Sequence, residues 1–212
     1  MRNYELIIFD LDGTLADTSE GIYNAHKYAN VQMGREEPSE AEMQDIIGAP
    51  LLDTYIGRFG YEKDEAKRAV KIYRDWYAKY GVNEVKLYNK ICEMLRVLRH
   101  KKYRLAVATL KAENLANDVL NHLGIAQFFE LIRGVDENDA LTKCDLINLC
   151  IEELKGNKRK SVLVGDSMHD LSGAEEAGID FIAVRYGFGS FGERRLDMMK
   201  SINEPLEILN VL

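Results

Sequence analysis

Short apolar runs without polar alternation occur once near the start of the chain and several times in its second half. Such runs are typical of strands that are covered on both faces, as in a parallel sheet flanked by helices. They predict strands over residues 6–9, 105–108, 162–164 and 181–184.

Amphipathic helices are predicted between these strands. Apolar residues recur at the i, i+3, i+4, i+7 spacing of one helix face in two segments, at Ile91, Met94, Leu95 and Leu98 and at Ile147, Cys150, Ile151 and Leu154. Gly124 and Gly178 each follow a helical stretch, where a left-handed helix end is expected. From residue 85 onward the order is therefore β-α-β-α. It predicts an α/β fold with a doubly wound, mainly parallel, Rossmann-like sheet.

Residues 18–81 show a different pattern. They contain no strand-like run, and apolar residues recur at helical spacing, at Ile22, Ala25, Ala29 and Met33. Ser39 and Glu42, just after Pro38, match a capping box and predict the start of another helix. Since one strand precedes this segment and the others follow it, we expect an all-helical cap domain over residues 16–85. Linkers near residues 15–18 and 81–87 would join it to a core of residues 1–15 and 86–212.

Composition narrows the class of protein. The 212 residues are 46% hydrophobic and 30% charged, which excludes a disordered chain. A net charge of −7 argues against partners such as nucleic acid or an anionic membrane. No apolar run is long enough for a signal peptide or a membrane span, so we expect a cytoplasmic protein, either a monomer or a homodimer. Cys92, Cys144 and Cys150 lack Cys-x-x-Cys spacing and are expected to be reduced thiols.

Two acidic clusters directly follow predicted strands. The first is Asp10-Leu11-Asp12-Gly13-Thr14, and the second is Gly165-Asp166-Ser167-Met168-His169-Asp170. A simple Asp-Gly turn would explain Gly13, but not a charge at the end of a hydrophobic strand. In open α/β sheets the carboxyl ends of the strands form the ligand crevice. We therefore expect Asp10, Asp12, Asp166 and Asp170 to converge there.

Converging carboxylates predict a bound cation. A pair 4 Å apart repels by roughly 4 kcal/mol at an effective dielectric constant near 20, so several cannot all stay ionised alone. Ligation by carboxylate oxygens and water selects Mg²⁺. Magnesium beside carboxylates indicates phosphoryl chemistry, in which the metal neutralises and positions the phosphate.

Four stretches together resemble the motifs of the haloacid dehalogenase superfamily. They are Asp10-Leu11-Asp12-Gly13-Thr14-Leu15-Ala16-Asp17-Thr18, Thr109 at a strand end, Lys143, and Gly165-Asp166 with Asp170. A helical insertion straight after the first motif is similar to the phosphoglycolate phosphatase and β-phosphoglucomutase branch. The resemblance extends over essentially the whole chain.

The resemblance implies a role for each matched residue. Asp10 would be the nucleophile that forms an aspartyl phosphate, and Asp12 would protonate the leaving oxygen and later activate water. Asp166 would ligate the metal with Asp10 and the backbone carbonyl of Asp12, and Asp170 would support these ligands. Lys143 would bridge Asp10 and the phosphate. The expected phosphate-binding or substrate-binding residues are Gly13, Thr14, Thr109, Leu110 and Lys143 of the core and Gly48 of the cap.

Several of these residues have a simpler interpretation. Thr109 could cap a helix starting near Lys111, a role compatible with phosphate binding. Lys143 could be a solvated surface lysine, but the Thr142–Asp145 pattern puts it in a first helical turn, where a cation opposes the helix dipole. The helically spaced aromatic residues of the cap favour packing over stacking on a nucleobase; they are Tyr73, Trp76, Tyr77 and Tyr80.

The predicted function is hydrolysis of a small phosphorylated metabolite by a Mg²⁺-dependent phosphatase. Two alternatives stay open, a sugar phosphomutase of the β-phosphoglucomutase type and a non-catalytic phospho-ligand sensor. The chain departs from many superfamily members at Leu110, where an asparagine is frequent. Arg58 is a further candidate for substrate contact, and His169 is expected at the rim of the crevice.

Overall fold

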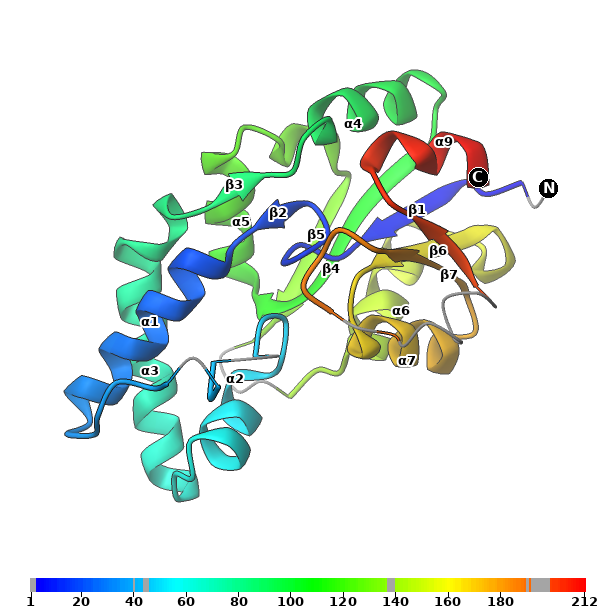
Figure 1. Ribbon diagram of the computed structural model, residues 1–212. Helices are drawn as coiled ribbons and strands as arrows, with labels where there is room; N and C mark the ends of the chain where they lie inside the picture. The colour runs from blue at the N-terminus through cyan, green and yellow to red at the C-terminus, as the bar shows by residue number, and fades with distance from the viewer. Residues whose placement is uncertain (1–2, 40, 44–45, 137–139, 190, 192–198) are drawn as a thin grey trace.

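The computed structural model describes residues 3–39, 41–43, 46–136, 140–189, 191 and 199–212, and within these ranges six parallel strands form one sheet (Figure 1). The strand order is β5-β4-β1-β6-β7-β8. The strands are β1 (Leu6–Phe9), β4 (Arg104–Ala112), β5 (Leu131–Val135), β6 (Ser161–Gly165), β7 (Asp180–Val184) and β8 (Lys200–Ile202). The predicted fold class is confirmed.

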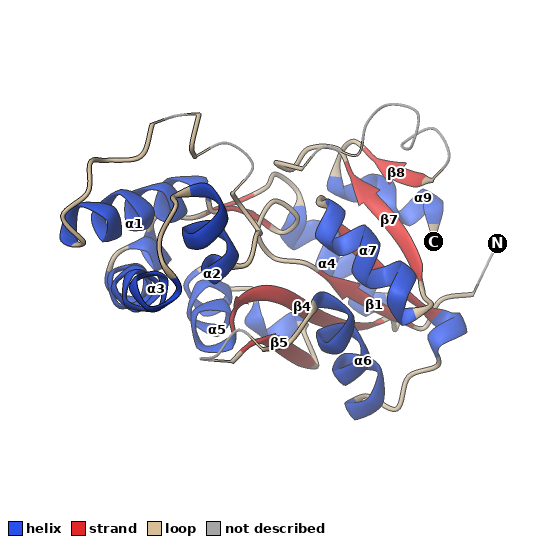
Figure 2. Ribbon diagram, turned by 90° about the horizontal axis from the view of Figure 1, so that it is seen from below, coloured by secondary structure: helices blue, strands red, loops and turns tan. Residues whose placement is uncertain are grey.

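Helices cover both faces of the sheet, which explains why its strands lack polar alternation (Figures 1 and 2). Leu6 and Ile8 of β1 pack toward α6 (Lys143–Glu153) and α7 (Met168–Ala177). Ile7 and Phe9 face the opposite side, with α4 (Ile91–His100), α5 (Glu113–His122) and α9 (Ile208–Val211). Short 3₁₀ turns complete this part at η3 (Ala126–Phe128), η4 (Lys158–Lys160) and η5 (Pro205–Glu207).

The four predicted strands are all present, but β4 is longer than expected. It continues through Thr109 to Ala112, and its register against β5 shifts between Ala108 and Ala112. Helix α5 consequently begins at Glu113, with Ala112 as its N-cap, so the prediction that Thr109 caps this helix is wrong. Strands β5 and β8 were not predicted. Arg133 and Gly134 interrupt the apolar run of β5, and β8 has only three residues.

Residues 16–87 lie between β1 and α4 and are mainly helical; they are called the insertion below. Its long helices α1 (Ser19–Gln32) and α3 (Lys63–Lys79) pack against each other, with α2 (Leu51–Asp53) and the π-helical turn η1 (Thr54–Arg58) between them in the chain. A two-stranded antiparallel ribbon of β2 (Ala16–Asp17) and β3 (Lys86–Leu87) lies where the two linkers were predicted. The 3₁₀ turn η2 (Gly81–Asn83) leads from α3 into this ribbon.

The capping pattern at Ser39 forms without a helix behind it. Ser39 Oγ donates to Glu42 Oε2 at 2.7 Å, and Glu42 N donates back to Ser39 Oγ at 3.3 Å. However, the described residues 41–43 form turns, so the prediction of a helix there is wrong. Gly48, at a φ of 77°, and Pro50 follow closely and leave little chain for the costly first helical turn.

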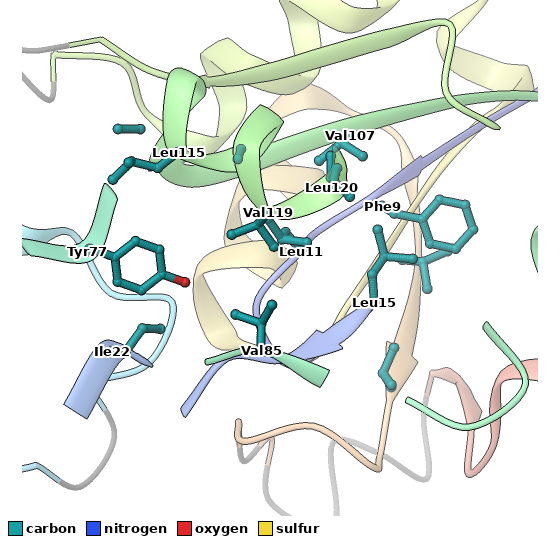
Figure 3. Close-up of a cluster of buried hydrophobic side chains, with 14 of the residues drawn as sticks. Phe9, Leu11, Leu15, Ile22, Tyr77, Val85, Val107, Leu115, Val119 and Leu120 are labelled. Carbon is teal, nitrogen blue, oxygen red and sulfur yellow. The ribbon is translucent and has the colours of Figure 1, made fainter. Parts of the chain in front are cut away.

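The insertion shares one buried apolar cluster with the sheet and its helices. Figure 3 shows Tyr77 of α3 and Ile22 of α1 on the side of the insertion. Opposite them lie Leu11, which follows β1, and Val119 of α5. All four side chains are buried. Among the described residues, no helix combines the length and the apolar character needed to cross a membrane.

Candidate active site

Three carboxylates meet at the carboxyl end of the central strands. Asp10 follows β1 and donates its backbone N–H to the carbonyl of Val164 on the neighbouring β6, while Asp166 follows β6 itself. Asp170 lies in the first turn of α7, where it forms a capping box with Ser167. Carboxylate oxygens of Asp10, Asp166 and Asp170 all lie within 4.8 Å of one another, and the three residues are buried.

Lys143 is the cation of this cluster. The Thr142–Asp145 capping box forms as expected and starts α6 at Lys143, which directs the side chain inward. Its Nζ lies 2.5 Å from Asp10 Oδ1 and 2.6 Å from Asp170 Oδ1. The side chain is only 5% exposed, so Lys143 is not a solvated surface lysine.

One ammonium does not balance three buried carboxylates. Burial raises the pKa of Asp10 to about 8, against the opposing attraction of Lys143, and the nearby carboxylates of Asp170, Asp12 and Asp166 add to the rise. Burial likewise raises the pKa of Asp166 to about 6, with Asp170 contributing. Burial alone would lower the pKa of Lys143, but the adjacent Asp10 and Asp170 raise it. The cluster therefore has the charge and the donors for a further cation.

The donor set fits Mg²⁺. All three carboxylates offer oxygen, the element that Mg²⁺ prefers, and two of them are held in place by hydrogen bonds. Asp166 Oδ2 accepts from the backbone N–H groups of Phe188 and Gly189 at 2.8 and 3.1 Å. Asp170 Oδ2 accepts from Ser167 Oγ at 2.6 Å. Such outer contacts orient ligands around a metal.

Glycines surround Asp166 so closely that no side chain would fit. A Cβ on Gly13, whose φ is 79°, would lie 2.1 Å from Asp166 Oδ2, and one on Gly187 would lie 2.4 Å from the same atom. A Cβ on Gly189 would lie 2.0 Å from the backbone oxygen of Asp166. Thr14 Oγ1 approaches Asp166 Oδ1 at 3.4 Å. Sequence reasoning identified Gly13 and Thr14 but missed the loop after β7; its only signal was the pair of glycines at 187 and 189.

Asp12 lies outside the carboxylate cluster and has its own partner. Its Oδ2 is 3.0 Å from Lys111 Nζ, and both side chains are almost fully buried. Burial would lower the pKa of Lys111, but Asp12 raises it. Lys111 Nζ also lies 4.4 Å from the ring centroid of Tyr77 in α3, so the insertion covers this ion pair. Sequence reasoning did not select Lys111, although it stands two residues after Thr109.

Thr109 and the remaining candidates take different positions. Thr109 is buried in β4, and its hydroxyl accepts a hydrogen bond from the backbone N–H of Lys111 at 3.3 Å. Leu110 and Gly48 line a small cavity together with Asp12. Arg58 is exposed and is not among the described residues that line this cavity. His169 is exposed on α7.

The aromatic residues of α3 mainly pack within the insertion. Tyr73 and Tyr77 are buried and stack with ring centroids 5.8 Å apart and an interplanar angle of 11°. The ring centroid of Trp76 lies 5.3 Å from that of Tyr80 and 6.0 Å from that of Tyr28 in α1. Tyr73 is the member of this group that also lines the small cavity beside Asp12.

Comparison with known proteins identifies the family. The sequence model of the haloacid dehalogenase-like hydrolases matches residues 7–184. The chain belongs to this family. This haloacid dehalogenase-like hydrolase is 35% identical over 193 residues to a 5'-nucleotidase of Pseudomonas aeruginosa, with 91% of this chain and 87% of the relative covered.

Further similarities cover most of the chain. The tyrosine-protein kinase PtkA of Mycobacterium tuberculosis is 36% identical over 186 residues, which cover 87% of this chain and 63% of PtkA. The crystal structure of a predicted phosphatase from Clostridium acetobutylicum superposes with a TM-score of 0.90 at 29% identity, covering 98% of this chain and 99% of the other. The family match, together with the similarity to the 5'-nucleotidase and to the structure of the predicted phosphatase, identifies the chain as a haloacid dehalogenase-like phosphatase.

Proposed function

We propose that this phosphatase uses Mg²⁺ to hydrolyse a small phosphomonoester through an aspartyl phosphate on Asp10. The observation that carries the proposal is the buried cluster of Asp10, Asp166 and Asp170 with Lys143 in contact with two of them. A nucleophilic carboxylate, a cation for the phosphate and oxygen donors for a metal are thereby within one site.

Asp10 and Asp166, with the backbone carbonyl of Asp12, would hold the metal, and Asp170 would orient these ligands. Bound Mg²⁺ supplies charge neutralisation for the phosphate oxygens. Lys143 would add a second positive charge beside Asp10, so that a phosphate dianion can approach a carboxylate. The phosphate would contact Thr109, which lies in β4 two residues after Val107, the partner of Phe9 in β1.

In the first step, a carboxylate oxygen of Asp10 attacks phosphorus, and the bond between phosphorus and the ester oxygen breaks. The electron pair of that bond goes to the leaving oxygen, which takes a proton from Asp12 and departs as an alcohol. For this step Asp12 must contact the substrate while its Oδ2 stays beside Lys111. The buried Asp12 Oδ1, which has no hydrogen-bond partner, is the atom placed to do so.

In the second step, water attacks the phosphorus of the aspartyl phosphate. Asp12 accepts the proton of the water, the bond between phosphorus and Asp10 breaks, and phosphate is released. Lys111 would stabilise Asp12 while the latter is ionised. We also propose that residues 16–85 act as a cap domain over this chemistry and residues 1–15 and 86–212 as the catalytic core.

The test compares the wild type with Asp10→Asn and Asp75→Asn, using p-nitrophenyl phosphate with Mg²⁺. Asp75 is an exposed carboxylate of α3 whose contact with Lys71 lies on the surface, so its variant is a matched control. Asp10→Asn should lose activity by roughly a thousandfold or more, and Asp75→Asn should keep it. EDTA should abolish wild-type activity, and Mg²⁺ should restore it.

A second measurement identifies the intermediate. Asp12→Asn should still be phosphorylated by p-nitrophenyl phosphate, whose leaving group needs little protonation, but should hydrolyse slowly. Acid-quenched protein should then carry a phosphoryl adduct on Asp10 that hydroxylamine removes. Full activity in EDTA, or an adduct on another residue, would contradict the proposal. Phosphate returned to a sugar substrate instead of water would indicate the mutase alternative.

A further inference from the structure

A small cavity lies between Asp12 and the insertion. Asp12, Leu110 and Lys111 line it from the sheet side, and His26, Gly48 and Tyr73 line it from the insertion. Its volume is about 30 Å³, enough for one or two water molecules or for a single small polar group of a substrate. Because the leaving oxygen departs toward Asp12 in the proposed mechanism, the cavity is where the group attached to that oxygen would lie.

His26 brings an unused polar atom to this cavity. The side chain comes from α1 and is 1% exposed. Its Nδ1 lies 3.2 Å from the hydroxyl of Tyr55, whereas its Nε2 is buried and has no hydrogen-bond partner. Asp12, which lines the same cavity, also has a buried polar atom without a partner, its Oδ1. Buried polar atoms are usually paired, so two residues that line one cavity and each have an unpaired polar atom point to a ligand that pairs with both.

The His26 ring is fixed and uncharged. It packs against Tyr73, Tyr55 and Phe59, with ring centroids 4.6, 5.3 and 5.4 Å away. Burial and the charge of Lys111 lower the pKa of His26 to about 3, so the imidazole is neutral at physiological pH. A rigid ring of this kind presents one directed hydrogen bond at Nε2 without bringing a charge to the cavity.

We propose that His26 Nε2 binds a hydroxyl group of the leaving alcohol and thereby determines which phosphomonoesters this enzyme prefers. The inference rests on the proposed function. In one tautomer Tyr55 donates to Nδ1 and Nε2 is a donor; in the other Nε2 is an acceptor. A hydroxyl group can donate or accept, so it suits both tautomers. The cavity admits a single small polar group, so the proposed ligand is the hydroxyl of a short alcohol and not a nucleoside.

The experiment uses two pairs of matched esters in the presence of Mg²⁺. The first pair is 2-hydroxyethyl phosphate and propyl phosphate, and the second is 3-hydroxypropyl phosphate and butyl phosphate. Within each pair a hydroxyl replaces a methyl group of similar size. The measured quantity is the ratio of kcat/KM for the hydroxylated ester to that for its alkyl partner. In the wild type we expect a ratio of about ten or more in at least one pair.

Three variants separate the role of Nε2 from a structural role. The side-chain amide of His26→Asn reaches the position of Nδ1 but not that of Nε2, so the ratio should fall to about one. The longer His26→Gln reaches the position of Nε2 and should restore most of the preference. Tyr55→Phe, the control, removes the contact at Nδ1 but leaves Nε2, and should keep the preference. If His26→Asn does not fold, His26→Phe, which retains an aromatic ring in the stack, replaces it.

The outcomes distinguish this inference from the proposed function. Cleavage of p-nitrophenyl phosphate by the wild type without preference in either ester pair overturns the role of His26 but leaves the phosphatase mechanism standing. A preference that survives in His26→Asn, or in His26→Phe, also overturns it. Failure of the wild type to cleave p-nitrophenyl phosphate and all four esters overturns both.

Discussion

At the scale of single residues, the conformation of Asp166 depends on the absence of side chains around it. The space that a Cβ would occupy on Gly13 is filled by the Asp166 carboxylate. Gly13 also has a φ of 79°, which is unfavourable for any residue with a Cβ. The effect of the steric overlap can be separated from that of the positive φ, because Gly178 at the end of α7 has a φ of 71° but open space where a Cβ would lie.

The comparison of Gly13→Ala with Gly178→Ala tests this requirement. Gly178→Ala should lower the free energy of unfolding by about 1 kcal/mol, because only the left-handed conformation is affected. Gly13→Ala should lose roughly 1–3 kcal/mol more because of the steric overlap, and should need a higher Mg²⁺ concentration for half-maximal activity. Urea denaturation and metal titration measure the two effects. Equal stability losses and unchanged Mg²⁺ dependence would show that Asp166 has room to move.

The sequence predicted a charged residue of the site only where the residues next to it in the chain form an unusual pattern. Asp10 follows an apolar run, and Lys143 occupies an unfavourable position in a helix, so both stand out. Lys111 has no such mark, because its burial depends on β4 continuing past Thr109 and on Tyr77 covering it from a distant segment. His26 was likewise invisible, because its unpaired nitrogen becomes evident only when Tyr55 and the cavity are placed around it.

At the scale of elements, the same capping pattern has two outcomes. Thr142 and Asp145 exchange hydrogen bonds at the start of α6, which positions Lys143. Ser39 and Glu42 exchange the same bonds in an exposed turn. A capping box stabilises a helix only where an apolar face holds that helix in place, as Leu146, Ile147 and Cys150 do for α6.

Replacing each capping hydroxyl should therefore give unequal losses. Thr142→Ala should lower the free energy of unfolding by about 1 kcal/mol and should also slow phosphate release, because Lys143 lies in the turn that is loosened. Ser39→Ala, with no helix to cap, should change stability by less than about 0.5 kcal/mol. Urea denaturation and a phosphate-release assay measure both variants. A larger stability loss for Ser39→Ala would contradict the interpretation.

The elements that sequence predicted well are those fixed by local periodicity. In the central strands the apolar residues are consecutive, and in helices α4 and α6 they recur at helical spacing. In each case the pattern fits only one kind of secondary structure that buries these residues. Strand β5 was not predicted because the charged Arg133 interrupts its apolar run. Ion pairs with Glu113 and Glu153 stabilise Arg133 at this edge of the sheet, and the sequence does not show these contacts. The extension of β4 depends on pairing with β5, a contact between segments far apart in the chain.

At the scale of the whole molecule, the insertion covers the Asp12–Lys111 side of the candidate site, and we propose that it moves to admit substrate. Tyr77 lies over Lys111, and the apolar cluster around Leu11 continues into α1 and α3. The chain passes from the sheet into the insertion and back at the ribbon of β2 and β3, which has only two residues in each strand. A short ribbon of this kind is suited to act as a hinge for a cap domain over residues 16–85.

Small-angle scattering tests this movement. With Mg²⁺ and vanadate, a phosphate analogue, the radius of gyration should be smaller than without ligands, because the bound anion favours the closed form. Vanadate in EDTA serves as the control and should give the profile of the free protein. Identical profiles under all three conditions would mean that substrate enters without a domain movement.

The central position of β1 has a consequence for how the protein is made. On the ribosome, Asp10 emerges early, but β1 pairs on one side with β4 and on the other with β6. At about 5–20 residues per second, the roughly 150 residues between β1 and the end of β6 take about 8–30 s to synthesise. Until β6 is made, the apolar segment Leu6–Phe9 lacks at least one of its two partner strands, so a nascent chain interrupted before Gly165 lacks Asp166 and leaves one edge of β1 unpaired.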